Sequence, residues 1–174
     1  MKPLYAVLGV GAAALLGACQ SIPPDAPRAS ASLQPTKGST VKGTVNFVQI
    51  GDKVRVTANV SGLRSGGEFG FHIHEAGDCS SGDGMSTKGH FNPLGKSHAH
   101  HATTERHAGD LPSLKSDAGG NASLSADLDV ITVAAGPTSV VGRGLIVHAQ
   151  PDDFKTQPTG NAGARSACAV IQRS

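Results

Sequence analysis

The sequence contains no tryptophan and only 3% aromatic residues, so its hydrophobic core must be built mainly from Val, Leu, Ile, Ala and Phe. Its formal net charge is only +2 over 174 residues, which is too small an excess to indicate binding to nucleic acid or to a charged membrane surface. It also lacks a long hydrophobic run, because the apolar stretch Leu4–Leu16 is shorter than the roughly 20 residues of a membrane-spanning helix. The length is typical of a single domain.

The first residues are typical of an export signal. Lys2 precedes the apolar stretch, and Leu16-Gly17-Ala18-Cys19 at its end resembles the bacterial lipobox, in which the cysteine is lipidated after cleavage. Residue 20 is glutamine rather than aspartate, which by the sorting rule for such lipoproteins points to the outer membrane. We predict a lipoprotein signal peptide at 1–18 and an exported, periplasmic or cell-envelope protein that a lipid on Cys19 anchors to the outer membrane. The alternative is a plain secretory signal in which Cys19 is incidental.

Residues 19–38 are predicted to form a flexible tether. They combine proline with serine and alanine, and they show no apolar periodicity. The folded domain is therefore expected to comprise residues 39–174.

Short alternating segments predict an all-β domain. No long segment after the signal has a helical period, and 23 glycines and 10 prolines fit a chain with many turns. Residues 49–52 are expected to connect the first two strands as a hairpin. Such a pattern indicates an antiparallel sandwich or barrel. The expected strands are Thr40–Val48, Val54–Val60, Ala122–Leu128, Leu145–His148 and Ala169–Ile171.

Six histidines and one aspartate are spaced like the ligands of two metal ions that share one side chain. His72 and His74 alternate with Phe71 and Ile73, so in a strand both imidazoles would leave one face while the apolar side chains, with Phe69, face a core. Imidazole suits zinc and copper, and a carboxylate joins it readily at zinc. The candidate ligands are His72, His74, His90, His98, His107, Asp110 and His148.

The middle members of this set fall in a loop. Glycine and proline interrupt the segments 89–93 and 106–110, so this part of the chain is expected to fold around an ion. His148 follows the apolar run 145–147 and would end a strand.

These motifs resemble those of the copper–zinc superoxide dismutases. The resemblance extends from about Thr40 to Ile171, and it implies a flattened eight-stranded antiparallel Greek-key barrel, an immunoglobulin-like sandwich, with two long functional loops at about 75–111 and 149–166. The matching motifs are Gly70–Glu75, Gly89–Pro93, Arg106–Asp110, Val147-His148 and Gly160–Cys168.

The resemblance also implies one copper ion and one zinc ion per chain, with superoxide as the substrate. His90 would bridge the ions as imidazolate and couple proton transfer to electron transfer while superoxide is converted to dioxygen and hydrogen peroxide. The alternative is a non-catalytic domain that binds or delivers copper. The implied copper ligands are His72, His74, His90 and His148, and the implied zinc ligands are His90, His98, His107 and Asp110.

Further roles follow from the same resemblance. Arg165 would guide the anion at the copper mouth, Thr159 would line the channel, and Lys155 would assist steering. Asp152 would accept hydrogen bonds from one copper ligand and one zinc ligand, His72 and His98. Three interpretations remain open for His100 and His101. They are exposed loop residues, or they capture metal, or one of them replaces His98 as the zinc ligand.

The three cysteines allow one disulfide besides the lipid. With Cys19 lipidated, Cys79 and Cys168 remain as an even pair, which an oxidising compartment would join; the alternative is two free thiols. Segments 141–143 and 170–171 resemble those that pair subunits in eukaryotic-type dimers, so a homodimer is expected.

Overall fold

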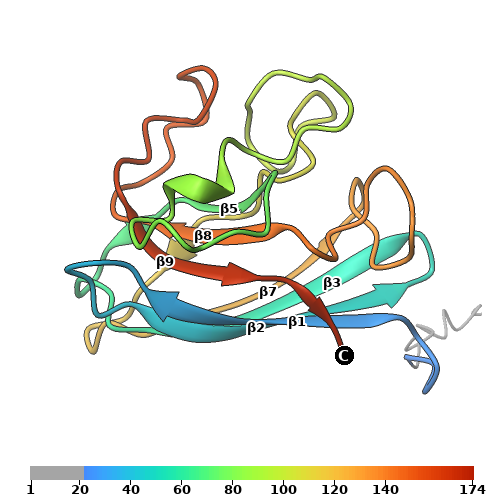
Figure 1. Cartoon of the computed structure of the whole chain (residues 1–174), viewed down its shortest axis with the longest axis horizontal. Helices are drawn as coiled ribbons and strands as arrows, with labels where there is room; N and C mark the ends of the chain where they lie inside the picture. The colour runs from blue at the N-terminus through green and yellow to red at the C-terminus, as the bar shows by residue number, and fades with distance from the viewer. Residues whose placement is uncertain (1–21) are drawn as a thin grey trace, which may run out of the picture.

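The computed structural model describes residues 22–174, which form an all-β domain (Figure 1). The named strands pair antiparallel, and the one named helix in the described range is a single 3-10 turn, η1 (Met85–Thr87). This confirms the predicted fold class. The strands are β1 (Arg28–Pro35), β2 (Lys42–Ile50), β3 (Lys53–Ser61), β4 (Glu68–Phe69), β5 (Phe71–His74), β6 (Leu114–Lys115), β7 (Ala122–Leu128), β8 (Gly144–His148), β9 (Arg165–Val170) and β10 (Gln172–Arg173).

Strand β1 joins the two layers of the molecule. The main sheet has the order β5-β8-β9-β1-β2-β3-β7, and β10 pairs with the first half of β1. After the β1-β2-β3 meander the chain crosses to the far edge at β5, returns to β7, and crosses again to β8. These crossings are the Greek-key connections that the resemblance implied.

The expectation of a flexible tether over residues 19–38 is wrong from Arg28 onward. Strand β1 pairs with β2 over six residue pairs and with β9 at its end, so it is an interior strand. Ala29, Ala31 and Leu33 alternate toward the core and are at most 4% exposed, while serines between them face outward. Two of the three buried side chains are alanines, and alanine differs so little from serine in size and hydrophobicity that the sequence shows only a weak strand pattern here. The part of the tether before residue 22, including Cys19, lies outside the described residues.

The core lies between the two layers and is built from alternating residues of the strands. Phe47, Val54, Val56, Phe71 and Ile73 are fully buried. Because each strand alternates, Arg55 between Val54 and Val56 points away from this core, and so does His72 between Phe71 and Ile73, although His72 is itself fully buried. The predicted strands at 54–60 and 122–128 are confirmed as β3 and β7.

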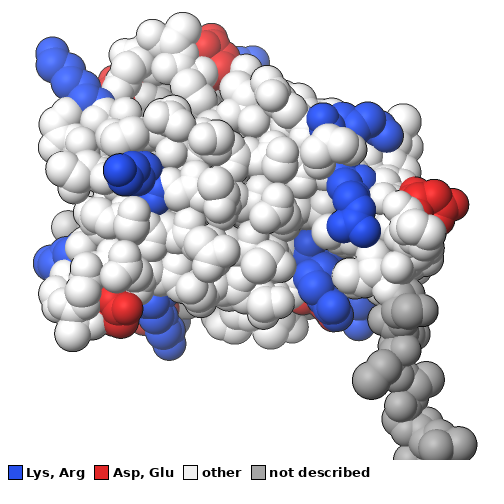
Figure 2. Space-filling view, turned by 90° about the horizontal axis from the view of Figure 1, so that it is seen from below, with Lys and Arg blue, Asp and Glu red and all other residues white. Residues whose placement is uncertain are grey.

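The outer face of the β1-β2-β3-β7 layer carries few charges at its centre (Figure 2). Ser30, Asn46, Thr57 and Ser125 lie opposite one another on successive strands and form an uncharged row. The two long connections, between β5 and β6 and between β8 and β9, rise together on the opposite side of the molecule (Figure 1). The two long loops and the face shown in Figure 2 therefore lie on opposite sides of the molecule.

A disulfide fastens the first long loop to the sheet. Cys79 and Cys168 are bonded with their Cα atoms 6.0 Å apart, as the sequence predicted. Within residues 22–174, no helix has the length and apolar character needed to cross a membrane. Of the segments expected to pair subunits, Ile171 is fully buried in the chain's own core, so it offers no surface to a partner.

Candidate metal centre

Two neighbouring strands position the first histidines. His72 and His74 lie in β5, and the strand's alternation sends Phe71 and Ile73 into the core on the other side. Strand β8 pairs with β5 and ends at His148, whose backbone N–H donates to the carbonyl of Gly70. The imidazole of His148 therefore comes to the same end of the strand pair as that of His72.

Four histidines converge on one point. The ligand atoms of His72, His74, His90 and His148 all lie within 4.8 Å of one another, and all four residues are buried. One ring nitrogen of each has no hydrogen-bond partner among residues 22–174: Nδ1 of His72 and Nε2 of the other three. Buried polar atoms are nearly always paired, so four unpaired nitrogens at one point indicate that an ion completes the site.

The opposite ring nitrogen of each histidine is held by the protein. His72 Nε2 donates to Asp152 Oδ2 at 2.6 Å, and His74 Nδ1 donates to the carbonyl of Lys88 at 2.8 Å. His148 Nδ1 donates to the carbonyl of Gly163 at 3.1 Å. These contacts assign the tautomers and leave the lone pairs of the converging nitrogens free for a metal ion.

A second set shares His90. The ligand atoms of His90, His98, His107 and Asp110 also lie within 4.8 Å of one another. Asp110 Oδ1 is 2.9 Å from His90 Nδ1, 3.0 Å from His98 Nδ1 and 3.4 Å from His107 Nδ1. These separations are close to the roughly 3.3 Å between ligand atoms of a tetrahedral zinc site with bonds of about 2.0–2.1 Å.

Backbone groups orient the aspartate of this set. The amides of Ala99 and His107 both donate to Asp110 Oδ2 at 3.1 Å. Oδ1 is thereby turned toward the three imidazoles. His90 presents Nδ1 to this set and its unpaired Nε2 to the first, so its ring lies between the two groups.

Burial and hydrogen bonding give His98 a different protonation state from His90 and His148. Mainly through burial, the pKa of His90 is lowered to about 4 and the pKa of His148 to about 3. Both rings are therefore neutral at pH 7. Burial also lowers the pKa of His98, but hydrogen bonds to Asp110 and Asp152 outweigh it and raise that pKa to about 9. A metal ion that binds His98 must therefore displace a proton.

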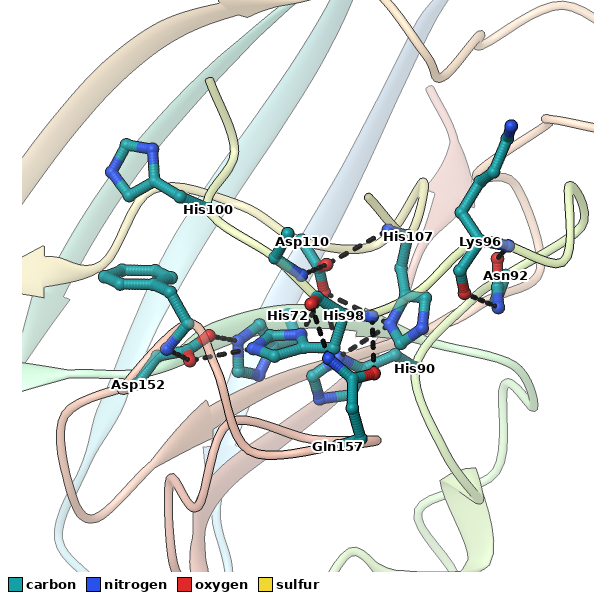
Figure 3. A network of polar contacts seen from close by, with 12 residues as sticks. His72, His90, Asn92, Lys96, His98, His100, His107, Asp110, Asp152 and Gln157 are labelled. Atoms are coloured by element: carbon teal, nitrogen blue, oxygen red, sulfur yellow. Dashed lines mark hydrogen bonds and ion pairs between the residues drawn. The ribbon is translucent and has the colours of Figure 1, made fainter. Parts of the chain in front are cut away.

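Asp152 contacts one histidine of each set (Figure 3). Its Oδ2 accepts from His72 Nε2, and its Oδ1 accepts from His98 Nε2 at 2.9 Å and from the backbone amide of Phe154 at 2.7 Å. Gly160 packs directly against this contact, because a Cβ at that position would clash with Asp152 Oδ1 and His98 Nε2. Asp152 thus touches the residue pair that the resemblance implied.

Arg165 lies beside the first set. It begins β9 directly opposite His148, and its positive charge helps to lower the pKa of both His148 and His74. Nη1 donates to the carbonyl of Gly84 at 2.6 Å and to Thr87 Oγ1 at 2.7 Å, and Nη2 donates to the carbonyl of Lys88 at 2.6 Å. These acceptors are uncharged, so the guanidinium is fixed in place without being neutralised.

The family model for copper/zinc superoxide dismutase (SODC) matches residues 41–171. The chain belongs to this family. It is 37% identical over 149 residues to Cu-Zn superoxide dismutase 2 of Aquifex aeolicus, covering 83% of this chain and 86% of that protein. It is 41% identical over 137 residues to the Cu-Zn superoxide dismutase of Paramecium bursaria Chlorella virus 1, covering 75% of this chain and 72% of that protein.

A solved structure shares the fold. The crystal structure of the clock protein EA4 is 39% identical and superposes with a TM-score of 0.77, covering 83% of this chain and 93% of that one. Membership of the copper/zinc superoxide dismutase family implies an oxidoreductase with one copper and one zinc ion, as predicted. The site fits both ions, because four unpaired imidazole nitrogens suit copper and a His₃Asp set suits zinc.

The remaining residues of interest lie around this dismutase site. Thr159 is half-buried in a turn of the second loop, and Lys155 is exposed in the same loop. The rings of His100 and His101 are in contact with centroids 4.0 Å apart and planes tilted by 38°, and His100 points away from Asp110 (Figure 3). Neither belongs to the two possible ligand groups that the described residues contain, whereas His98 belongs to the second of them.

The sequence did not indicate several partners of the ligands. The carbonyls of Lys88 and Gly163 fix two imidazoles, and the Gln157 side chain contacts the main chain of His98. Every residue has a carbonyl group, so residue type carries no signal for such contacts. The glycine-rich composition around Gly163 indicates a close approach of backbone but not its partner.

Proposed function

We propose that this protein catalyses the dismutation of superoxide to dioxygen and hydrogen peroxide with a histidine-bound copper, and that His90 bridges it to a zinc ion. The observation that carries the proposal is the convergence of four buried, unpaired imidazole nitrogens next to a complete His₃Asp set. The proposed copper ligands are His72, His74, His90 and His148, and the proposed zinc ligands are His90, His98, His107 and Asp110.

His90 is the residue that can couple protons to electrons. When bound, copper supplies one-electron oxidation and reduction, whereas zinc has no redox chemistry. Because Nδ1 of His90 is turned toward Asp110 and the zinc set, Nε2 is the ring atom that can take up and return a proton. The overall reaction consumes two superoxide anions and two protons and yields one dioxygen and one hydrogen peroxide.

Arg165 supplies the attraction for the anion. Its guanidinium is held by two carbonyls and a hydroxyl rather than by a carboxylate, so its charge remains available to superoxide. A domain that only stores or delivers copper has no use for a fixed cation at this place. We assign Thr159 to the wall of the same channel.

We further propose that the enzyme removes superoxide in the cell envelope. The signal-like residues 1–18, the lipobox cysteine Cys19 and the Cys79–Cys168 disulfide support export and attachment to the outer membrane. Cys19 lies outside the described residues. We retain a homodimer as a proposal, with Val141 and Val170, which are half-buried in the chain, as candidate contacts.

The test combines metal analysis with a superoxide-consumption assay. Wild-type protein loaded with both ions should consume superoxide catalytically, and His74→Ala and His148→Ala should lose copper and activity while the disulfide-closed fold remains. The control is Gln49→Ala. This change removes a hydrogen-bonded side chain at the β2-β3 hairpin, away from the proposed metal ligands. Wild-type protein that binds copper at this site but does not turn over superoxide would favour a storage or delivery role.

A further inference from the structure

The zinc set takes one of three nearby histidines. His98, His100 and His101 carry identical donor atoms on a loop without regular secondary structure. In extended chain, side chains two residues apart point the same way, so a slip of two residues would present His100 in place of His98. Contacts outside these side chains must therefore set which histidine reaches the ion.

Two side-chain amides hold the main chain just at this point (Figure 3). Asn92 Oδ1 accepts from the backbone amide of Lys96 at 3.0 Å, and Asn92 Nδ2 donates to the carbonyl of the same residue at 2.8 Å. Gln157 does the same to His98: its Oε1 accepts from the backbone amide at 2.9 Å, and its Nε2 donates to the carbonyl at 2.8 Å. Each amide thus binds both polar groups of one main-chain residue.

The two amides belong to different loops, and together they can select His98 over His100 and His101. Asn92 belongs to the same loop and closes a turn that contains Gly95 with φ +62°, so it fixes the path of the main chain from Asn92 to Lys96. Gln157 belongs to the second long loop, the loop that also carries Asp152. A slip of two residues would break the turn at Asn92 or withdraw the His98 main chain from Gln157.

Asp152 and Gln157 hold one histidine by both its ring and its main chain. The carboxylate of Asp152 accepts from His98 Nε2, while Gln157 fixes the backbone of the same residue. With both ends fixed, Nδ1 can face Asp110 only from its present position. Meanwhile His100 packs edge-on against Phe154 with ring centroids 4.7 Å apart, which occupies it away from the zinc set.

We propose that Gln157 is a positioning residue for the zinc site, which acts with Asn92 to select His98 rather than His100 or His101 as the ligand. The proposal rests on the proposed assignment of the second set to zinc. Gln157 is exposed, so a leucine at this position removes both hydrogen bonds without disturbing the core.

The experiment compares Gln157→Leu with Gln49→Leu. Gln49 is a matched control, because its side-chain amide also bonds several backbone groups but lies at the β2-β3 hairpin, away from the metal centre. Zinc affinity is measured on metal-free protein by competition with a chelator, and cobalt(II) in the zinc site reports the ligand set through its absorption spectrum. Gln157→Leu should weaken zinc binding on the order of tenfold, as the loss of two hydrogen bonds predicts, and should alter the cobalt spectrum. Gln49→Leu should change neither.

The selection is tested by replacing His100 and His101 with asparagine in both backgrounds. In wild-type protein this double change should leave cobalt affinity unchanged, whereas in Gln157→Leu it should lower the affinity further because the substitute ligands are gone. An equal effect in the two backgrounds, or wild-type affinity and spectrum in Gln157→Leu, overturns the proposal while leaving the zinc assignment intact. Wild-type protein that binds no zinc overturns the assignment and this proposal together.

Discussion

Asp152→Asn should weaken the proposed copper site more than the proposed zinc site. The carboxylate of Asp152 is 5% exposed and has three donors around it: His72 Nε2 on Oδ2, and His98 Nε2 with the Phe154 amide on Oδ1. Asparagine keeps one acceptor oxygen. That oxygen is expected to remain where two donors meet, next to His98 and Phe154, so the amide nitrogen faces His72.

The new amide nitrogen forces His72 to change. Two donors cannot face each other at 2.6 Å, so the His72 ring must either turn away or shift its proton to Nδ1, the nitrogen that converges with those of the other proposed copper ligands. Removal of a partner that orients a metal ligand typically costs about 10- to 100-fold in affinity. We expect a loss in this range for copper and a smaller loss for zinc.

The assay titrates copper into zinc-loaded protein and, separately, zinc into metal-free protein, each against a competing chelator. Asp152→Ala, which removes both acceptor oxygens, should weaken both ions and serves as the comparison. If Asp152→Asn weakens zinc more than copper, or weakens neither, the argument from acceptor placement is refuted.

Three further outcomes are expected. Arg165→Ala should keep its copper but consume superoxide more slowly, and Arg165→Lys should recover part of the rate through charge alone; unchanged rates at low ionic strength would remove Arg165 from the proposed role. The zinc affinity of metal-free protein should fall by roughly tenfold for each pH unit below about 9. Hydrogen bonds raise the pKa of His98 to about 9, so zinc must displace a proton from that ring at lower pH. A zinc affinity that does not change between pH 6 and 8 would show that His98 is already neutral. A chain that starts at residue 28 should fold and hold both ions, whereas one that starts at residue 39 should lose cooperative unfolding because β1 is gone; equal thermal unfolding of the two would contradict the interior position of β1.

Much of the site could be predicted because its ligands lie in regular structure or in distinct motifs. His72 and His74 alternate with buried Phe71 and Ile73, so one face of a strand had to carry both rings. His148 ends a short run of apolar residues, which indicates a buried strand and is one in the structure. For these residues local periodicity determines direction.

Other parts could not be predicted because they depend on contacts between distant segments. Gln157 meets His98 across 59 residues, and nothing in the neighbourhood of either residue indicates the other. Strand β1 was missed for a different reason: one proline precedes it and Pro35 ends it, and its buried positions include the small residues Ala29 and Ala31, so composition suggested a linker. Hydrogen bonding to β2 and β9 overrides that composition.

The start of β1 at Arg28 limits how far the enzyme can stand from a membrane. If lipid is attached at Cys19 as proposed, the residues between Cys19 and Arg28 can span at most roughly 30 Å, even when fully extended. Arg165 lies at the other end of β1, where its carbonyl accepts from Thr36 Oγ1 at 2.6 Å. The lipid would therefore hold the N-terminal end of β1 close to the bilayer, and the entrance for the anion would lie at the opposite end of β1. Superoxide would be intercepted in a thin layer beside the lipid surface rather than throughout the compartment.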